Sequence, residues 1–292
     1  MKKSVHIAAI SILLLASAGS AWYLQSTVAK PKTRNGSAVH AVQAPPSPAA
    51  NFIVACLGGF RSLAAEIIWF RADRLQNEGR YAELAQLGAW LTFLEPHTPE
   101  IWAYVAWNLS YNISVMMPTP EDRWRWVESG LRLLRDDGLR LNPNSPELCR
   151  EIAWLFLLKI AGDTDTAAPF YREKWSETAG KTQSDGKWET LSMSPGVMAE
   201  IEKKYRKLDW RDANASAVYW SYLGVNDQCK KGVEANLRQI RFLAFMQMAK
   251  TDPSFAQFAL AEMKESNKLF PSKSLTGLIR SFAMKYNLNP GD

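Results

Sequence analysis

The sequence contains few of the residues that enzymes use for acid–base chemistry or phosphate binding. Its 292 residues include only three histidines, His6, His40 and His97, and none of them lies among carboxylates or beside a nucleophile. A histidine-based triad or general base therefore has no candidate member. A phosphate-binding loop is missing as well, because "CLGGFRS" follows no strand pattern and lacks the required lysine. We expect a protein that is not an enzyme and needs no cofactor.

Cysteine is also scarce. Cys56, Cys149 and Cys229 are odd in number and widely separated, which excludes a disulfide framework, and no CxxC or Cys/His spacing suggests a metal site. Each of the three lies in a predicted helix among apolar neighbours. We therefore expect them to be small buried hydrophobic residues, in a protein without bound metal.

Positive charge exceeds negative charge only slightly. The 35 basic and 29 acidic residues give a net charge of +6, and no run of five or more lysines and arginines occurs. Nucleic-acid binding is therefore not expected. Apolar residues make up 47% of the chain and charged residues 22%, which is typical of a globular protein.

The longest apolar run lies at the N-terminus, from Val5 to Leu24. It has about the 20 residues that a membrane-spanning helix needs. Lys2 and Lys3 precede it and favour a cytoplasmic N-terminus. The sequence thus predicts a single-pass anchor that contacts the membrane through residues 5–24.

A cleaved signal segment is the alternative, because Ala16-Ser17-Ala18 fits an A-x-A cleavage site. The aromatic pair Trp22-Tyr23 suits a membrane interface and favours retention of the anchor. We assign residues 1–28 to the membrane anchor or signal segment. Residues 29–50, rich in proline and alanine, form a tether.

After Asn51 the sequence is helical and lacks strand signals such as β-branched alternation. Five junctions place a capping oxygen directly before a proline, which predicts helix starts. They are Thr98-Pro99, Thr119-Pro120, Ser145-Pro146, Ser194-Pro195 and Asp252-Pro253. The predicted helix pairs are 51–77 with 80–95, 99–116 with 120–141, and 146–161 with 165–179. Further helices are predicted at 195–208, 213–224, 228–250, 253–269 and 272–286, after a polar loop at 180–195.

One thirteen-residue phrase occurs twice in this helical region. "EPHTPEIWAYVAW" at 95–107 and "NPNSPELCREIAW" at 142–154 align at an offset of 47 residues. The aligned pairs include Pro96/Pro143, Pro99/Pro146, Glu100/Glu147, Ala106/Ala153 and Trp107/Trp154. Each phrase spans a helix end, a capped turn and the next helix start. Such repeats stack, because one helix pair cannot bury its own apolar face.

These phrases resemble the tetratricopeptide (TPR) repeat family. "EGRYAELAQLGAWLTFLEP" carries that family's second-helix residues Gly79, Tyr81 and the closing Pro96, and "PEIWAYVAWNL" carries first-helix residues around Ala106. The period departs from the family's 34 residues, which implies an insertion around "SVMMPTPEDRWRW". Most of residues 51–225 also resembles bacterial membrane-anchored TPR-like proteins.

The resemblance implies an all-α fold of stacked antiparallel helical hairpins, a TPR-like α-α superhelix behind the N-terminal membrane helix. Residues 51–180 would be the repeats, and residues 181–292 divergent C-terminal repeats and a cap. The implied location is the bacterial inner membrane with the helical domain in the periplasm, or the periplasm itself after signal cleavage.

Trp107 and Trp154 share a repeat position that in the TPR family can face the concave groove. The predicted partner-binding set is completed by charged and aromatic neighbours: Glu100, Tyr111, Glu147 and Arg150. Aromatic side chains with charged edges suit protein recognition. The alternative is that both tryptophans pack between hairpins. On the predicted insertion, Trp124 and Trp126 could form an exposed aromatic-basic patch or cover the groove.

The expected function is a scaffold that holds a protein or peptide partner of an envelope assembly in its groove. One alternative is an α-helical toroid enzyme or binder acting on envelope polysaccharide, suggested by the tryptophans and the acidic pairs Asp136/Asp137 and Asp163/Asp165. We expect ordinary ion pairs at Asp136/Asp137, and at the turn that holds Asp163 and Asp165 we expect Asp165 or Thr164 to cap the next helix. The other alternative is a purely structural subunit of a membrane complex, which would present a flat apolar patch.

Overall fold

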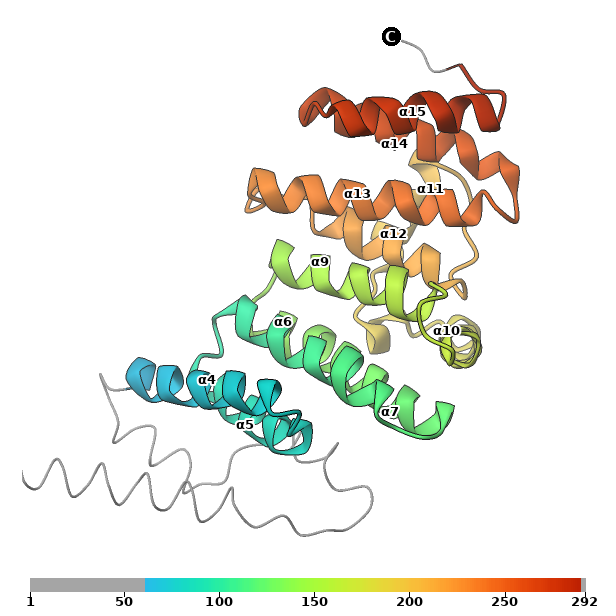
Figure 1. Ribbon diagram of the computed structural model, residues 1–292. Helices are drawn as coiled ribbons and strands as arrows, with labels where there is room; N and C mark the ends of the chain where they lie inside the picture. The colour runs from blue at the N-terminus through green and yellow to red at the C-terminus, as the bar shows by residue number, and fades with distance from the viewer. Residues whose placement is uncertain (1–60, 290–292) are drawn as a thin grey trace, which may run out of the picture. The chain divides into compact units, whose positions relative to one another are not determined.

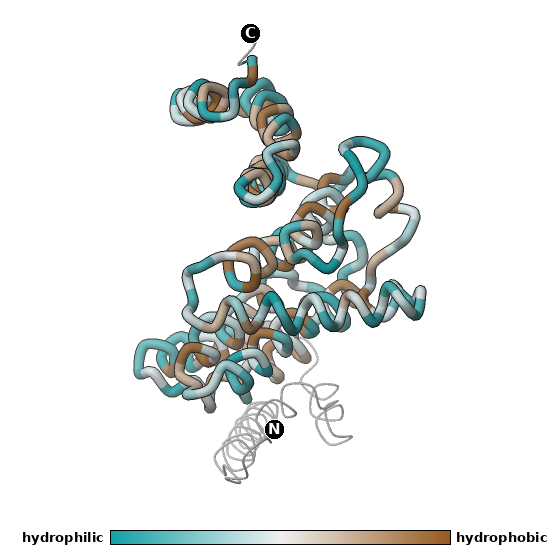
Figure 2. The backbone as a smooth tube through the Cα atoms, turned by 90° about the vertical axis from the view of Figure 1, so that its right-hand side faces the viewer, coloured by the Kyte–Doolittle hydropathy of each residue, from teal (hydrophilic) through white to brown (hydrophobic). Residues whose placement is uncertain are grey.

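The computed structural model describes residues 61–289, and every regular element among them is helical (Figure 1). This confirms the all-α prediction. The predicted anchor, the tether, His6, His40 and Cys56 lie outside the described residues. Along the described helices, hydrophilic and hydrophobic residues alternate (Figure 2). None of these helices has the length and apolar composition needed to cross a bilayer.

The chain divides into two compact units between Glu95 and Pro96. In the first unit, α4 (Arg61–Asn77) and α5 (Tyr81–Leu94) form an antiparallel hairpin. Gly79 takes a positive φ of 70° in the connecting turn, a conformation in which glycine carries no steric penalty. The hairpin matches the described part of the predicted pair 51–77 and 80–95.

The second unit begins with a helix that changes its winding partway along. The α-helical part α6 (Pro99–Trp107) continues directly into the π-helical segment η2 (Asn108–Ile113). The same pattern recurs in α9 (Pro146–Trp154) and its π-helical continuation η4 (Leu155–Ile160). Both pairs of elements are related by the offset of 47 residues, as Pro99 to Pro146 shows. The sequence repeat is therefore also a repeat of helix geometry, down to the change of winding after each tryptophan.

The first predicted hairpin of this unit is confirmed. Its second helix consists of α7 (Pro120–Arg132), the π-helical η3 (Leu133–Gly138) and the short α8 (Leu139–Leu141), and it packs on α6 and η2. The helices cross closely at Gly130, where an added Cβ would lie 2.8 Å from the carbonyl oxygen of Ala106 and would also overlap the Ser110 hydroxyl. Only glycine permits this approach.

The second predicted hairpin, 146–161 with 165–179, forms only in part. Helix α10 (Ala168–Asp185) contacts η4 and α7, while α9 packs mainly against α12 (Ala213–Leu223). Aromatic residues explain the position of α10: Trp175 meets Phe156 at 4.5 Å between ring centroids, and Tyr171 meets Trp124 at 5.9 Å. The apolar face of α10 is thus shared between two helices.

The remaining helices follow in sequence. They are the 3₁₀ turn η5 (Trp188–Leu191), α11 (Pro195–Lys204), α13 (Lys231–Met248), the 3₁₀ turn η6 (Pro253–Phe255), α14 (Ala256–Leu269) and α15 (Lys273–Lys285). Helix α13 packs between α12 and α14, and α14 packs on α15. Within the second unit, α6, α9, α13 and α15 follow one another along the stack (Figure 1).

Two sequence predictions in this unit are wrong, and one of the two alternatives for Trp124 and Trp126 is excluded. The segment 180–195, predicted as a polar loop, is helical over much of its length, because α10 continues to Asp185, where Gly186 with a φ of 66° ends it, and a 3₁₀ turn follows at Trp188–Leu191. Cys229 lies in the turn before α13, half-buried, whereas Cys149 is buried as predicted. Trp124 and Trp126 are only 9% and 8% exposed, so they form no aromatic patch at the surface. Helix α7 is amphipathic and turns both rings into the core.

The proline junctions confirm the predicted helix starts. All five prolines occupy the beginning of a helix. The side chains of Thr119, Ser145 and Asp252 accept a hydrogen bond from a backbone N–H in the first turn, while those of Thr98 and Ser194 do not. At Thr98 and Ser194 the extended backbone and the proline alone mark the start.

Candidate functional site

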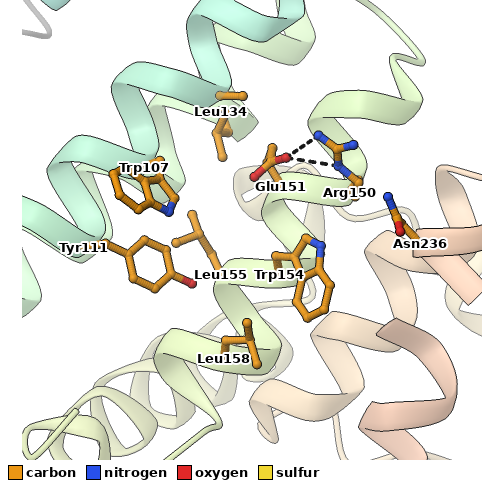
Figure 3. Close-up of a pocket in the computed structure, with 10 residues that line it drawn as sticks. Trp107, Tyr111, Leu134, Arg150, Glu151, Trp154, Leu155, Leu158 and Asn236 are labelled. Carbon is orange, nitrogen blue, oxygen red and sulfur yellow. Dashed lines mark hydrogen bonds and ion pairs between the residues drawn. The ribbon is translucent and has the colours of Figure 1, made fainter. Parts of the chain in front are cut away.

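A pocket of about 400 Å³ opens where α6, α9 and α13 come together (Figure 3). Helix α6 with η2 supplies one wall and α9 with η4 the other, and η3 and α13 contribute one residue each. The lining residues are Ala103, Trp107, Tyr111, Leu134, Arg150, Glu151, Trp154, Leu155, Leu158 and Asn236.

The two walls are built from equivalent positions of the repeat. Ala103, Trp107 and Tyr111 are each spaced by four residues, so they follow one face of their helix. Arg150, Trp154 and Leu158 occupy the same three positions 47 residues later and also line the pocket. The pocket therefore arises directly from the duplication seen in the sequence.

Trp107 resolves one of the alternatives left open by the sequence. Its side chain is 43% exposed, so it is not a core residue. Its ring stacks on Tyr111 with centroids 5.8 Å apart and an angle of 26° between the planes. Trp154 is half-buried on the opposite wall, and Figure 3 shows it between Leu158 and Arg150. The two tryptophans thus line the pocket between α6 and α9, and Trp107 is not buried in the core.

Tyr111 occupies the inner end of the aromatic wall. Burial, with a smaller contribution from the negative charge of Glu151, raises the pKa of its phenol, which therefore stays neutral. The ammonium of Lys159, which is buried, lies 5.3 Å from the centroid of the Tyr111 ring. The stacked Trp107 and this cation both contact the Tyr111 ring and favour its orientation.

The charged edge of the pocket is a single ion pair. Arg150 donates from Nε and Nη2 to Oε1 of its neighbour Glu151, at 3.0 and 2.5 Å. Figure 3 shows this pair above Trp154. Because each charge is already balanced by the other, the edge has no excess of either sign.

Behind the pocket lies a buried charge cluster centred on Asp165. Its carboxylate accepts hydrogen bonds from Lys159 at 2.6 Å and from the Tyr171 hydroxyl at 3.0 Å, and it pairs with Arg123 at 3.1 Å. Burial opposes ionisation of this carboxyl, but the hydrogen bonds outweigh it and lower the pKa to about 2. The cluster holds Lys159 in place beneath Tyr111.

The structure brings four of the six predicted site residues together and leaves two aside. Trp107, Tyr111, Arg150 and Trp154 line the pocket. Glu100 and Glu147 lie in the first turns of α6 and α9, seven residues before each tryptophan, about 10 Å away along the helix axis. Glu100 is exposed, and Glu147 accepts a hydrogen bond from Ser145.

The remaining lining residues were not predicted from the sequence. The repeat could have identified Leu158, because Leu158 occupies the position equivalent to Tyr111. The sequence could not have identified Asn236, because only the packing of α13 against α9 brings it to the pocket. Leu134 likewise comes from the second helix of the preceding hairpin.

The polar atoms of the aromatic residues are available to a ligand. The indole N–H groups of Trp107 and Trp154 and the hydroxyl of Tyr111 have no hydrogen-bond partner among residues 61–289. Flat apolar faces combined with free donors suit the backbone carbonyls and side chains of a bound peptide.

The four carboxylates of the two acidic pairs already form ion pairs within the protein. Asp136 pairs with Arg135 and Asp137 with Arg140, as expected, while Asp163 pairs with Arg172. Asp165 accepts a hydrogen bond from the backbone N–H of Ala167 in the turn before α10, but α10 begins at Ala168 without a side-chain cap, so the expected helix cap by Asp165 or Thr164 does not form. Within residues 61–289 no group of three or more His, Cys, Asp or Glu side chains is arranged to hold a metal ion.

Comparison with known proteins adds no family. No family model matches this chain, and neither a curated protein nor a solved structure matches it. The class that fold and site define is thus an all-α protein in which duplicated helices form an aromatic pocket.

Proposed function

We propose that this chain is a TPR-like scaffold of a bacterial envelope assembly, which binds a peptide segment or partner subunit noncovalently in the pocket between α6 and α9. Residues 5–24 anchor it in the inner membrane, and the helical part projects into the periplasm. The anchor rests on the apolar run of the sequence alone.

One observation supports the binding role above all. Equivalent residues of two repeats face each other across one pocket, and the tryptophan of the first repeat is 43% exposed although tryptophan is usually well buried. An exposed tryptophan beside a stacked tyrosine is the composition of interface hot spots. The surrounding helices hold these rings at fixed positions, which lowers the entropic cost of binding.

Site-specific crosslinking in intact cells tests this proposal. A photoreactive amino acid replaces Ala103 at the pocket wall of the full-length protein, and the crosslinked products are identified by mass spectrometry. We expect a defined partner that disappears when Trp107→Ala and Trp154→Ala are combined. The same photoreactive residue at the exposed position Gln257 in α14 is the control and should not capture this partner.

Folding of the double variant is checked by circular dichroism and thermal unfolding. A folded double variant that keeps the same crosslinked partner would contradict the proposal. Absence of any product from Ala103, with the protein in its native membrane, would contradict it too.

A second candidate function, a purely structural subunit, is favoured by the surface of α4. Leu63, Ile67 and Phe70 are 51%, 62% and 68% exposed and follow one another at spacings of four and three residues. They form an apolar stripe on one side of the helix, which suits a flat protein contact.

The two candidates are distinguished by paired variants. Ile67→Ser with Phe70→Ser removes the stripe, and Trp107→Ala with Trp154→Ala removes the aromatic wall. The size of the complex extracted in mild detergent is measured for each. If only the stripe variant releases the partner, the structural role holds and the binding pocket is dispensable. Carbonate extraction of membranes tests the anchor independently.

A further inference from the structure

A second pocket, of about 340 Å³, lies between α13 and α15. Apolar residues of both helices line it: Leu243 and Met246 from α13, and Leu278 and Phe282 from α15. Two exposed lysines complete its lining, Lys250 from the turn after α13 and Lys285 from the end of α15. The lining contains no carboxylate.

Neither lysine is neutralised by the protein. Lys250 donates a hydrogen bond from Nζ to the side-chain oxygen of Gln247 at 2.7 Å, and the Nζ of Lys285 lies 5.2 Å from the ring centroid of Tyr286. Within residues 61–289 neither forms an ion pair with a carboxylate. These neutral contacts hold both ammonium groups beside the pocket and leave their positive charge uncompensated.

Two acidic groups near the pocket are already engaged, and the exposed Glu265 of α14 does not line it. Asp252, two residues after Lys250, pairs with Arg206 at 3.2 Å. Glu262 of α14 is buried against Arg241 and Lys204. Helix α15 itself carries three basic residues and no acidic one. The pocket therefore has a distinctly positive edge, in contrast to the balanced ion pair of the first pocket.

One face of α13 connects the two pockets. Asn236 lines the first pocket and Leu243, seven residues further along α13, lines the second, which Lys250 also lines from the turn after the helix ends at Met248. Residues seven apart share a helix face, and at the rise of an α-helix the span from Asn236 to the end of α13 is about 18 Å. An extended segment of about six residues covers that distance.

We propose that the pocket between α13 and α15 is a docking subsite for an acidic segment of a protein partner. It takes an apolar side chain of the segment, while carboxylates on either side of that side chain pair with Lys250 and Lys285. This subsite rests on the proposed peptide-binding function and gives the partner a defined chemistry. The charge complementarity selects an acidic protein segment over a neutral or basic one.

Fluorescence anisotropy on the full-length protein in detergent tests the subsite. The probe is a fluorescein-labelled decapeptide with two central leucines between glutamates, and the comparison peptide has lysines in place of the glutamates. We expect the acidic peptide to bind at least about tenfold tighter, with an affinity that falls as salt is raised. In the variant Lys250→Glu/Lys285→Glu the preference should reverse, a result that misfolding cannot produce.

A matched control changes the same charge elsewhere. The variant Lys203→Glu/Lys268→Glu alters two exposed lysines that do not line the pocket and should keep the preference for the acidic peptide. Equal affinity for both peptides, or an unchanged preference in the Lys250/Lys285 variant, would overturn the inference. Binding of phosphatidylglycerol vesicles through these lysines, without peptide binding, would overturn it in favour of a lipid. A negative result in this peptide-binding experiment would not change the crosslinking result at Ala103. The docking subsite and the proposed peptide-binding function can therefore be refuted independently.

Discussion

Trp107 stacks on Tyr111, one helical turn further along, with ring centroids 5.8 Å apart and planes inclined by 26°. The ammonium of Lys159 lies 5.3 Å from the centroid of the tyrosine ring. Lys159 is held in turn by Asp165. Trp107 is therefore held in place while part of its ring is exposed to solvent. Exposure of this apolar surface is unfavourable unless a partner covers it.

Replacement of Trp107 should separate binding from folding. Because the side chain is 43% exposed, we expect Trp107→Ala to lower the free energy of unfolding by no more than about 1 kcal/mol. Affinity for the crosslinked partner should fall at least about tenfold. Trp220→Ala is the comparison: this ring is 1% exposed, and its loss should cost about 3–5 kcal/mol. Chemical denaturation of both variants checks the difference, and similar losses of stability would contradict the exposed position of Trp107.

Gly130 should tolerate no side chain. In Gly130→Ala the new methyl group would lie 2.8 Å from the carbonyl oxygen of Ala106, a backbone atom that cannot move aside. We expect a loss of about 1–3 kcal/mol in the free energy of unfolding. Gly232→Ala in α13 is the control, because its added Cβ meets nothing within 4 Å. That variant should be neutral or slightly more stable, and a thermal melt of each shows whether the two differ.

The helix starts and the duplication could be predicted from the sequence because their causes are local. A proline after a capping residue marks a helix start through its own backbone geometry. The repeated phrase 95–107 and 142–154 also identified Trp107 and Trp154 as equivalent. The change to π-helical winding after each of these tryptophans carries no comparable signal, because it follows from how the helix packs.

The errors have tertiary causes. Residues 180–185 include Gly180, Ser184 and Asp185, which have low helix propensity, so they suggested a loop. In the structure Ala179 and Thr182 are buried, and this packing extends the helix. The left-handed Gly186 was the local stop signal available in the sequence. Asn236 and the pocket at α15 depend on which helices meet, which no local pattern specifies.

Glu262 should be essential for the packing of α13 on α14. Its carboxylate accepts hydrogen bonds from Lys204 at 2.9 Å and from Arg241 at 3.3 Å, and both Glu262 and Arg241 are 3% exposed. Glu262→Gln leaves the guanidinium of Arg241 buried without its counter-charge, which should cost about 3–5 kcal/mol. Glu265→Gln, an exposed neighbour on the same helix, should change the free energy of unfolding by less than about 0.5 kcal/mol. Urea denaturation of the two variants compares these losses.

Asp165 should make the stability of the second unit depend on acid pH. Its pKa is lowered from the ordinary 3.8 to about 2, so the folded protein binds its proton less readily than the unfolded chain does. The carboxylate therefore contributes its full stabilisation above pH 4, about 2 kcal/mol, and loses it as the pH falls from 4 to 2.

Comparison with Asp165→Asn isolates this group from the other carboxyls. At pH 7 the variant should be less stable by about 3–5 kcal/mol, because Lys159 and Arg123 lose their buried counter-charge. The difference between wild type and variant should shrink steadily between pH 4 and pH 2 in unfolding followed by circular dichroism. A difference that stays constant over this range would show that Asp165 keeps an ordinary pKa. In that case the ion pair with Lys159 would not be what holds the lysine beneath Tyr111.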